Sequence, residues 1–189
     1  GSGAHGLRQL ALGRGFSPVR SQRPLPKSVS HETTFRDDVN DLELLRATLL
    51  SLTERVAADL RRKRLAARTV ALKVRFSTFH TVGRRRTLLR STAAPRSLHE
   101  TAMVLLDELN IGAHRVRLVG ISVGNLSHDA FQLTLDDSWR EAALNEAVDQ
   151  VRSRYGFKAL ALAGGALARD RLRQTDAAAA AELGVEPLC

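Results

Sequence analysis

The chain has 189 residues, 43% hydrophobic and 26% charged, and carries a formal net charge of +9 with a sequence pI near 11.0. This composition is typical of a soluble globular protein, and the basic balance favours a polyanionic partner such as DNA, RNA or an anionic membrane surface. The single cysteine, Cys189, excludes a disulfide framework or a Cys-based metal site within one chain and fits a reducing cytosol. The sequence has no run of about 18 apolar residues, so no transmembrane helix is expected. It has no apolar stretch near its start, so no secretory signal is expected either.

The first part of the chain is predicted to be a helix end followed by a linker. Residues 7–15 carry apolar residues closed by glycines, which indicates the end of a helix. Residues 16–27 contain Pro18, Pro24 and Pro26 among several cations, which is typical of an extended basic linker. Residues 28–35 alternate weakly and form a candidate first strand.

A long amphipathic helix is predicted next. The segment from Asn40 to Glu43 resembles a capping box, in which a side-chain acceptor and a Glu three residues later satisfy free N–H groups. The last turn, residues 61–64, is entirely basic and suits the negative end of the helix dipole better than a DNA contact. Apolar residues recur at spacings of three and four at Leu42, Leu45, Leu49, Leu52, Val56 and Leu60.

The most informative stretch runs from Arg61 to His99, which holds twelve Lys or Arg residues and no Asp or Glu. Within it, residues 68–77 alternate as a strand does. Such a strand presents cations and hydroxyls roughly 6.5–7 Å apart on one face, close to the rise between phosphates in a nucleic acid. This favours a phosphate-tracking sheet over an active site. One face would hold Val70, Leu72, Val74 and Phe76, and the other Thr69, Lys73, Arg75 and Ser77.

The remaining elements complete a β-α-β-β-α-β order. Residues 81–83 are predicted as a turn and residues 84–91 as a third strand. A second capping box at residues 97–100 opens a helix. Its apolar side carries Leu98, Ala102, Leu105, Leu106 and Leu109. Residues 115–119 form a fourth strand, with Arg115 and Arg117 on the face opposite Val116 and Leu118.

The fold class is therefore α/β of the α+β kind: a split βαβ, four-stranded sheet with two helices on one face, plus a C-terminal helix and tail. The other face of the sheet is expected to be free and basic. Beyond this unit, residues 132–136 read as a short extended peptide, residues 138–155 as a further helix, and residues from 159 on as an Ala-rich tail.

Four segments carry a further signal: residues 27–35, 67–75, 79–88 and 115–122. In this order they resemble the little-finger domain of Y-family translesion DNA polymerases. The resemblance is strongest to the bacterial DNA polymerase IV (DinB-like) group. Residues 132–156 resemble the segment that follows the little finger in actinobacterial members, which implies an actinobacterial source. The resemblance implies a helix end of the polymerase thumb at 1–17, a linker at 18–27 and the little finger at 28–126. A clamp-motif-like peptide and helix would follow at 127–156, and the tail at 157–189.

The resemblance implies a domain that holds duplex primer–template DNA by its backbone and does not read sequence. The implied parent is an error-prone DNA-directed DNA polymerase, a nucleotidyltransferase that uses Mg²⁺, located in the cytoplasm at the bacterial nucleoid. Its catalytic carboxylates would lie in a palm outside this chain, so no catalytic residue, metal site or cofactor is expected here, and we expect a monomer inactive alone. The DNA-binding residues implied are Lys27, Ser28, Ser30, Lys73, Arg75, Ser77, Thr78, Arg84, Arg85, Arg86 and Thr87.

Family members often end the domain with a Gln-Leu-x-Leu-Phe peptide that docks on the sliding clamp. Gln132, Leu133 and Leu135 match that pattern, but Asp136 stands where an aromatic anchor is usual. Because buried aromatic anchors carry much of the energy of such interfaces, the resemblance implies weak clamp binding. A plain edge strand is the alternative for this peptide.

Other functions stay open from the residues alone. The arginines at 84–86 could be a solvated turn. A catalytically inactive Y-family paralogue could use the same domain as a scaffold in a mutagenesis complex. An RNA-binding split βαβ module would be expected to show aromatics on the free face, where Arg, Lys and Thr are predicted instead. A membrane-surface protein would need a basic amphipathic helix with bulky aromatics, which is absent from the sequence.

Overall fold

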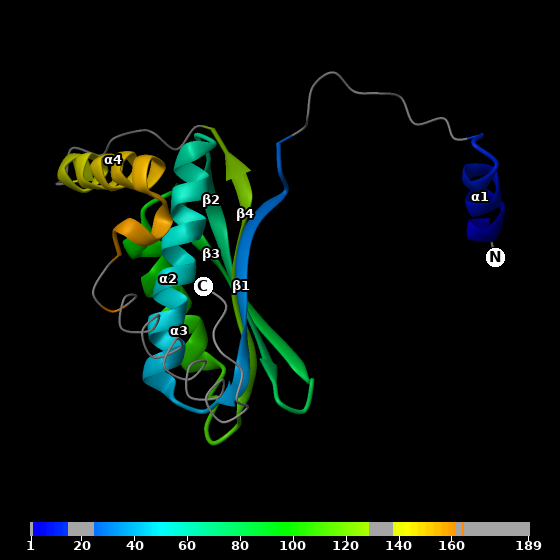
Figure 1. Cartoon of the computed structure of the whole chain (residues 1–189), viewed down its shortest axis with the longest axis horizontal. Helices are drawn as coiled ribbons and strands as arrows, with labels where there is room; N and C mark the ends of the chain where they lie inside the picture. The colour runs from blue at the N-terminus through cyan, green and yellow to red at the C-terminus, as the bar shows by residue number, and fades with distance from the viewer. Residues whose placement is uncertain (1, 15–24, 129–137, 162–163, 165–189) are drawn as a thin grey trace, which may run out of the picture.

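The computed structural model describes residues 2–14, 25–128, 138–161 and 164. An N-terminal helix, α1 (Ser2–Ala11), lies apart from a layered body (Figure 1). The helix ends before Gly13, whose φ of 70° lies in the left-handed region that glycine tolerates best. Most of the predicted linker and the peptide at 132–136 lie outside the described residues, as does most of the Ala-rich tail.

The body is a four-stranded antiparallel sheet with two helices packed on one face. The strands are β1 (Ser28–Val39), β2 (Ala66–Phe76), β3 (Thr81–Thr92) and β4 (Val116–Ser127), in the spatial order β1-β4-β2-β3. The helices on that face are α2 (Leu42–Arg62) and α3 (Pro95–Glu108). Each helix crosses between two strands that a third strand separates, so the predicted βαββαβ fold with two helices on one face is confirmed (Figure 1).

The core lies between the sheet and the two helices. From the sheet it takes residues such as Val70, Leu72 and Val74, which are at most 1% exposed, as the alternation predicts. From α2 and α3 it takes the predicted apolar stripes. These stripes supply Leu45, Leu49, Leu52, Val56, Leu60, Leu98, Ala102, Leu105 and Leu106. Leu42 is the exception in the first stripe, being 40% exposed at the first residue of α2.

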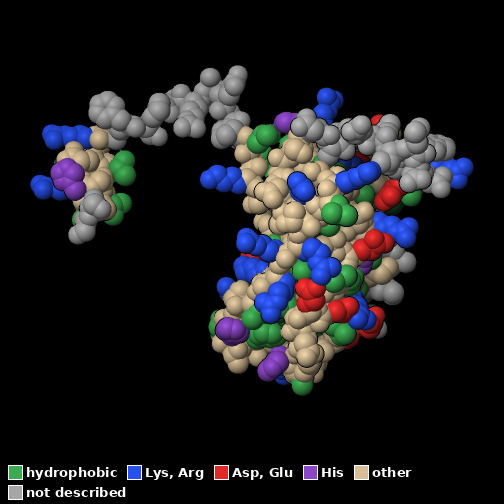
Figure 2. All heavy atoms as spheres, turned by 180° about the vertical axis from the view of Figure 1, so that it is seen from behind, with side chains coloured by type: hydrophobic (Ala, Val, Ile, Leu, Met, Phe, Trp, Pro, Cys, Tyr) green, Lys and Arg blue, Asp and Glu red, His purple; other side chains and the backbone are tan. Residues whose placement is uncertain are grey.

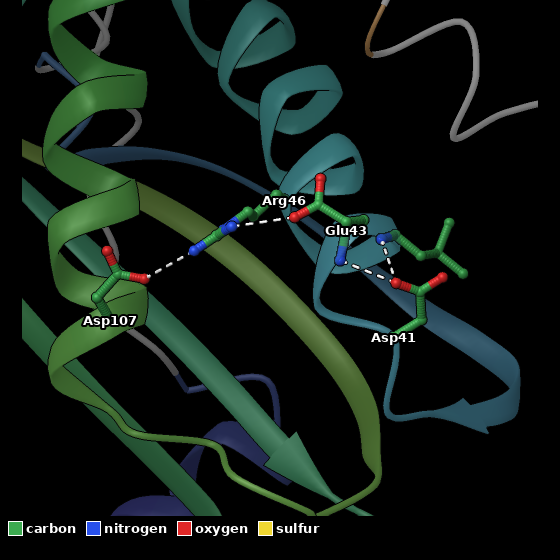
Figure 3. Close-up of polar contacts among 5 residues, drawn as sticks. Asp41, Glu43, Arg46 and Asp107 are labelled. Carbon is green, nitrogen blue, oxygen red and sulfur yellow. Dashed lines mark hydrogen bonds and ion pairs between the residues drawn. The ribbon is translucent and has the colours of Figure 1, made fainter.

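The N-terminus of α2 differs from the prediction by one residue. Asp41, not Asn40, is the cap, and its carboxylate accepts hydrogen bonds from the N–H groups of Glu43 and Leu44 at 2.9 and 3.2 Å. Arg46, one turn further on, pairs with Glu43 and reaches Asp107 on α3 (Figure 3). Asn40 and Asp41 both have side chains that can cap a helix. The path of the chain between β1 and α2 decides which of them does so.

The predicted capping box at Ser97–Glu100 is wrong. The helix starts three residues earlier, with Ala94 instead of Ser97 at the cap position and Pro95 in the first turn, and no side chain caps it. Proline supplies the fixed φ that suits this position and lacks the N–H that would go unsatisfied. Glu100 instead pairs with Arg96 on the exposed side of the helix.

The predicted turn at residues 81–83 is also wrong. These residues begin β3, where Val82 pairs with Val74 and Gly83 with Lys73. The hairpin turns between Phe76 and His80, and Phe79 takes a φ of 63° there. The glycine at position 83 does not form a turn. It allows close approach to β2, since a Cβ on it would lie 3.3 Å from the carbonyl oxygen of Leu72.

The last strand, β4, is longer than predicted and irregular at its start. Its partner positions jump from Arg75↔Leu118 to Phe76↔Val116, so Arg117 occupies a bulge. The bulge directs Val116 to the core and Leu118 to the opposite face of the sheet. Leu118 is buried even there, with 5% of its surface exposed. The prediction that these two residues share a face is therefore wrong.

A fourth helix, α4 (Ser138–Tyr155), and a short 3-10 turn, η2 (Phe157–Ala159), follow as predicted for residues 138–155. α4 is joined to α2 by polar contacts. Arg152 pairs with Glu54 at 3.0 Å, and both side chains are 7% exposed. Arg61 donates to both carboxylate oxygens of Asp149, so this arginine serves as a tie to α4 and not mainly as a helix cap.

Candidate nucleic-acid interface

The candidate site is the sheet face that the described helices leave uncovered, called here the open face. Because residues opposite each other in an antiparallel pair project to the same side, the strand registers define it row by row. One row is Ser30, Ser122, Ala71 and Arg85. The next is Glu32, Gly120, Lys73 and Gly83, and the one nearest the β2–β3 turn is Thr34, Leu118, Arg75 and Thr81.

Small and hydroxyl-bearing side chains dominate this face. The row farthest from the turn consists of Ser28, Gly124, Thr69 and Thr87. At Gly120 no larger residue fits, because a Cβ there would lie 2.8 Å from the Cβ of Glu32. A face of this kind is low enough for another backbone to approach closely, and it offers hydroxyl donors along its length.

Three cations stand out of this low surface: Lys73, Arg75 and Arg85. Arg75 donates from Nε to the hydroxyl of Thr81 at 2.9 Å, which ties its guanidinium to the neighbouring strand β3. Lys73 pairs with Glu32 at 2.9 Å, with side chains 43% and 54% exposed. Arg85 is exposed on the edge strand β3.

The arginine run of β3 is divided between the two sides of the sheet. Arg85 and Thr87 lie on the open face, opposite Ala71 and Thr69. Arg84 and Arg86 lie on the helix side, opposite Leu72 and Val70. Arg86 reaches α3 and pairs with Glu108. The run therefore cannot act as one patch, a point that the sequence run of three arginines conceals.

The other predicted residues lie around the open face. Ser28 and Ser30 are exposed on it at the edge strand β1, and Lys27 is exposed just before that strand. Ser77 and Thr78 lie in the hairpin turn instead of a strand. The clamp-peptide residues Gln132, Leu133 and Leu135, with Asp136, lie outside the described residues.

Two groups of residues were missed by sequence reasoning. On β4, Gly120, Ser122 and Gly124 form the centre of the open face. Small residues at every second position of a strand are a readable signal for them. The second case is Asn125, which has a φ of 51° and donates from its side-chain amide to the hydroxyl of Thr69 at 2.8 Å. No pattern in the sequence indicates this contact.

Lys and Arg side chains are distributed over much of the body seen from behind, and acidic side chains are fewer there (Figure 2). Among the described residues, no group of three or more His, Cys, Asp or Glu is placed to hold a metal ion. Within the same residues, no helix has both the length and the apolar character of a membrane span.

A half-buried histidine lies away from the open face. His99 on α3 has a pKa lowered from its ordinary value of 6.5, because burial disfavours its charged form more than Glu100 and Glu54 favour it. Its Nδ1 and the Oε2 of Glu54 are both buried without a hydrogen-bond partner in the described structure. This group belongs to the helical layer and bears on stability.

Comparison with known proteins gives one family. The model of the impB/mucB/samB family C-terminal domain matches residues 26–135, more than half of the chain. DNA polymerase IV of Dehalococcoides mccartyi (strain CBDB1) is 32% identical over 156 residues, which cover 82% of this chain and 40% of that protein. DNA polymerase IV of Methanoculleus marisnigri is 40% identical over 126 residues, covering 66% of this chain and 34% of that protein.

The similarity extends to other bacteria. DNA polymerase IV of Staphylococcus aureus (strain Newman) is 31% identical over 132 residues, covering 70% of this chain and 37% of that protein. The chain thus spans about 40% or less of the length of these relatives. A solved post-insertion binary complex of Dbh DNA polymerase matches 66% of this chain with a TM-score of 0.46 and 15% identity, too distant to bear on the site.

Proposed function

The chain belongs to the impB/mucB/samB family and is a Y-family polymerase C-terminal domain, and from this premise we propose that it binds duplex primer–template DNA by its backbone, irrespective of sequence. In this role it is the little finger of an error-prone translesion polymerase. The observation that carries the proposal is the open face, where Lys73, Arg75 and Arg85 stand among small and hydroxyl-bearing residues.

The chemistry of this face suits phosphates. Guanidinium, ammonium and hydroxyl groups donate to phosphate oxygens, and such contacts fix position without reading bases. Arg75 and Arg85 lie two rows apart on adjacent strands, so they can contact different phosphates of one backbone. The described residues of the open-face rows include no aromatic side chain that would stack a base, which argues against the alternative of an RNA-binding sheet.

Glu32 is the acidic residue of the open-face rows and pairs with Lys73. An exposed pair of this kind is worth at most about 1 kcal/mol, so a phosphate can compete for the ammonium group. Arg75, held by a neutral hydroxyl, has its charge fully available. We therefore assign Arg75 and Arg85 the main phosphate contacts and Lys73 a smaller one.

The rest of the proposal concerns the parent protein. Catalysis, with its carboxylates and Mg²⁺, is assigned to a palm outside this chain, and fingers and thumb would complete the enzyme. The chain itself would be a cytoplasmic, monomeric DNA-binding module, inactive alone. Docking of Gln132, Leu133 and Leu135 on a sliding clamp would be weak, because Asp136 replaces an aromatic anchor. An inactive paralogue that serves as a scaffold would bind duplex DNA in the same way. The palm sequence distinguishes it from an active polymerase, because the catalytic carboxylates would be present in the polymerase and absent from the paralogue.

The test is fluorescence anisotropy of the chain with labelled blunt duplexes of unrelated sequence, across a salt series. Similar affinities for all sequences and a steep, linear fall of log affinity with log salt are expected from counterion release. Arg85→Ala should weaken binding on the order of tenfold and lower the salt slope by about 0.9.

Arg84→Ala is the matched control, because it removes the same charge from the neighbouring residue on the helix side. It should change the affinity far less than Arg85→Ala. Absent duplex binding, binding that ignores salt, or equal effects of the two variants would refute the open face as the grip.

A further inference from the structure

The tip of the β2–β3 hairpin displays an aromatic ring. Phe79 is 65% exposed, although large apolar side chains at a turn are usually turned inward or absent. The guanidinium carbon of Arg117, in the bulge of β4, lies 4.9 Å from the centre of this ring. The ring is thus supported from one side by a cation and exposed to solvent elsewhere.

The backbone at Phe79 is held in a conformation that Phe rarely adopts. Its φ is 63°, in the left-handed region where Gly or Asn is the usual choice for the last residue of a three-residue hairpin loop. The N–H of Phe79 donates to Phe76 and the N–H of Phe76 donates to His80, both at 2.9 Å. A strained, exposed, bulky residue in a well-bonded turn indicates selection for what the side chain contacts outside the domain.

The surroundings of the ring are rich in basic residues. His80, His114 and Arg115 are exposed at the same end of the sheet, and the N–H of Ser77 donates to the carbonyl of Arg115 at 2.9 Å, which joins the two loops. Arg117 itself pairs with Asp38, with 3.6 Å between a guanidinium nitrogen and a carboxylate oxygen. An aromatic face among cations matches a nucleobase with its flanking phosphates, and not an apolar protein pocket.

The tip also continues the open face. The row of Thr34, Leu118, Arg75 and Thr81 is the last before the turn. A nucleic-acid strand that passes from one row to the next, along the direction of β2 and β3, therefore reaches Phe79 where the sheet ends. Bases inside a duplex are already stacked on each other, so only an unpaired base can use the ring.

We infer that the hairpin tip stacks an unpaired nucleobase at a junction between duplex and single strand, with Phe79 as the platform and Arg117 as its support. The inference rests on the proposed duplex grip, since the grip brings the junction to the tip. It assigns the domain a preference for duplexes that carry a single-stranded overhang, without a preference for the base.

The experiment compares three labelled probes by anisotropy: a blunt duplex, the same duplex with a template overhang, and the single strand alone. The wild-type chain should prefer the overhang duplex on the order of tenfold over the blunt one. A fluorescent adenine analogue at the first unpaired position should be quenched on binding.

Phe79→Ala and Phe79→Gly should both abolish the preference and the quenching while blunt-duplex affinity stays within about twofold. The Gly variant relieves the backbone strain at this residue. If both variants lose the overhang preference, the loss is due to the missing ring and not to a change in folding. Phe79→Trp should keep the preference. Leu89→Ala, which removes a 96% exposed apolar side chain from the same hairpin, is the matched control and should change nothing.

The outcomes separate the two proposals. If the wild type binds blunt and overhang duplexes equally, or the ring variants keep the preference, the inference is refuted and the duplex grip stands. If blunt duplex is not bound but overhang binding depends on Phe79, the tip is supported and the duplex grip fails. If no probe is bound, both are refuted.

Discussion

The two sides of the sheet both carry arginines, but they use them differently. On the helix side and in the helices, several arginines pair with carboxylates: Arg86 with Glu108, Arg152 with Glu54, and Arg61 with Asp149. On the open face, Arg75 is held by a hydroxyl. Net charge alone therefore does not locate the binding surface, because several of the cations are paired with carboxylates of the helical layer. What the sheet offers a polyanion is decided first by register, which selects the cations of the open face, and then by how weakly carboxylates hold them.

The comparison predicts that arginines of the helical layer act on stability and those of the open face on binding. The largest effect is expected at Arg152. Arg152→Met should leave the buried Glu54 without its partner and cost about 3–5 kcal/mol, read as lost hydrogen-exchange protection in α4 and a lower urea midpoint.

Arg62→Met is the control for that change, because Arg62 is 74% exposed where it pairs with Asp59. It should be nearly neutral. Duplex affinity should be unchanged in both variants. Unaltered exchange of α4 in Arg152→Met would show that the buried pair does not hold this helix.

The second effect in size concerns binding alone. Lys73, Arg75 and Arg85 changed together to Ala should weaken duplex binding about 100-fold at moderate salt and lower the salt slope by about 2.7. The matched variant changes Arg62, Arg84 and Arg96 to Ala, with the same loss of charge from the other side. If both triple variants weaken binding equally, only net charge matters and the comparison between the two sides fails.

A smaller effect is expected at the first turn of α2. Asp41→Ala removes the acceptor for two N–H groups and should lower the free energy of unfolding by about 1 kcal/mol. Asn40→Ala, at the residue that the capping-box pattern selects, should stay within about 0.5 kcal/mol. Chemical denaturation measures both. A larger loss for Asn40→Ala would mean that the cap is assigned to the wrong residue.

The smallest effect is a pH dependence of stability from His99. Burial lowers the pKa of His99 in the folded state below its unfolded value of 6.5, so the unfolded chain takes up this proton first. Stability from this group is therefore full above pH 6.5, falls as the pH drops below it, and levels off below the folded pKa.

His99→Gln should flatten that slope in urea unfolding followed across pH, while His80→Gln, at an exposed residue of the hairpin tip, should not. The charged groups around His99 act in the opposite direction, since Glu100 and Glu54 favour its protonated form. A slope that survives His99→Gln would assign the pH dependence to other groups.

Several local features could be predicted because they depend on periodicity. The alternation at 68–77 placed Val70, Leu72 and Val74 inward, and the spacing of leucines placed α2 and α3 on the sheet. Proline at the start of α3 was also readable, since Pro95 in the first turn is a known start signal, but the Ser-x-x-Glu pattern at 97–100 competed with it.

Other features could not be predicted, because they depend on pairing between distant segments. The bulge at Arg117 reverses the facing of Val116 and Leu118, and only the register against β2 reveals it. The hairpin turns at Phe79, a residue that turn preferences would reject, while Gly83 lies in a strand.

The sequence by itself determined the β-α-β-β-α-β order, the core faces and the presence of a basic, acid-free stretch, because strand and helix periods are local properties of the chain. The tertiary structure alone decided which arginines lie on the open face. Register assigns Arg85 to the open face and Arg84 and Arg86 to the helix side. Carboxylates contributed by α3 and other helices then neutralise the cations that they can reach, and these contacts join residues far apart in sequence, so no local pattern encodes them.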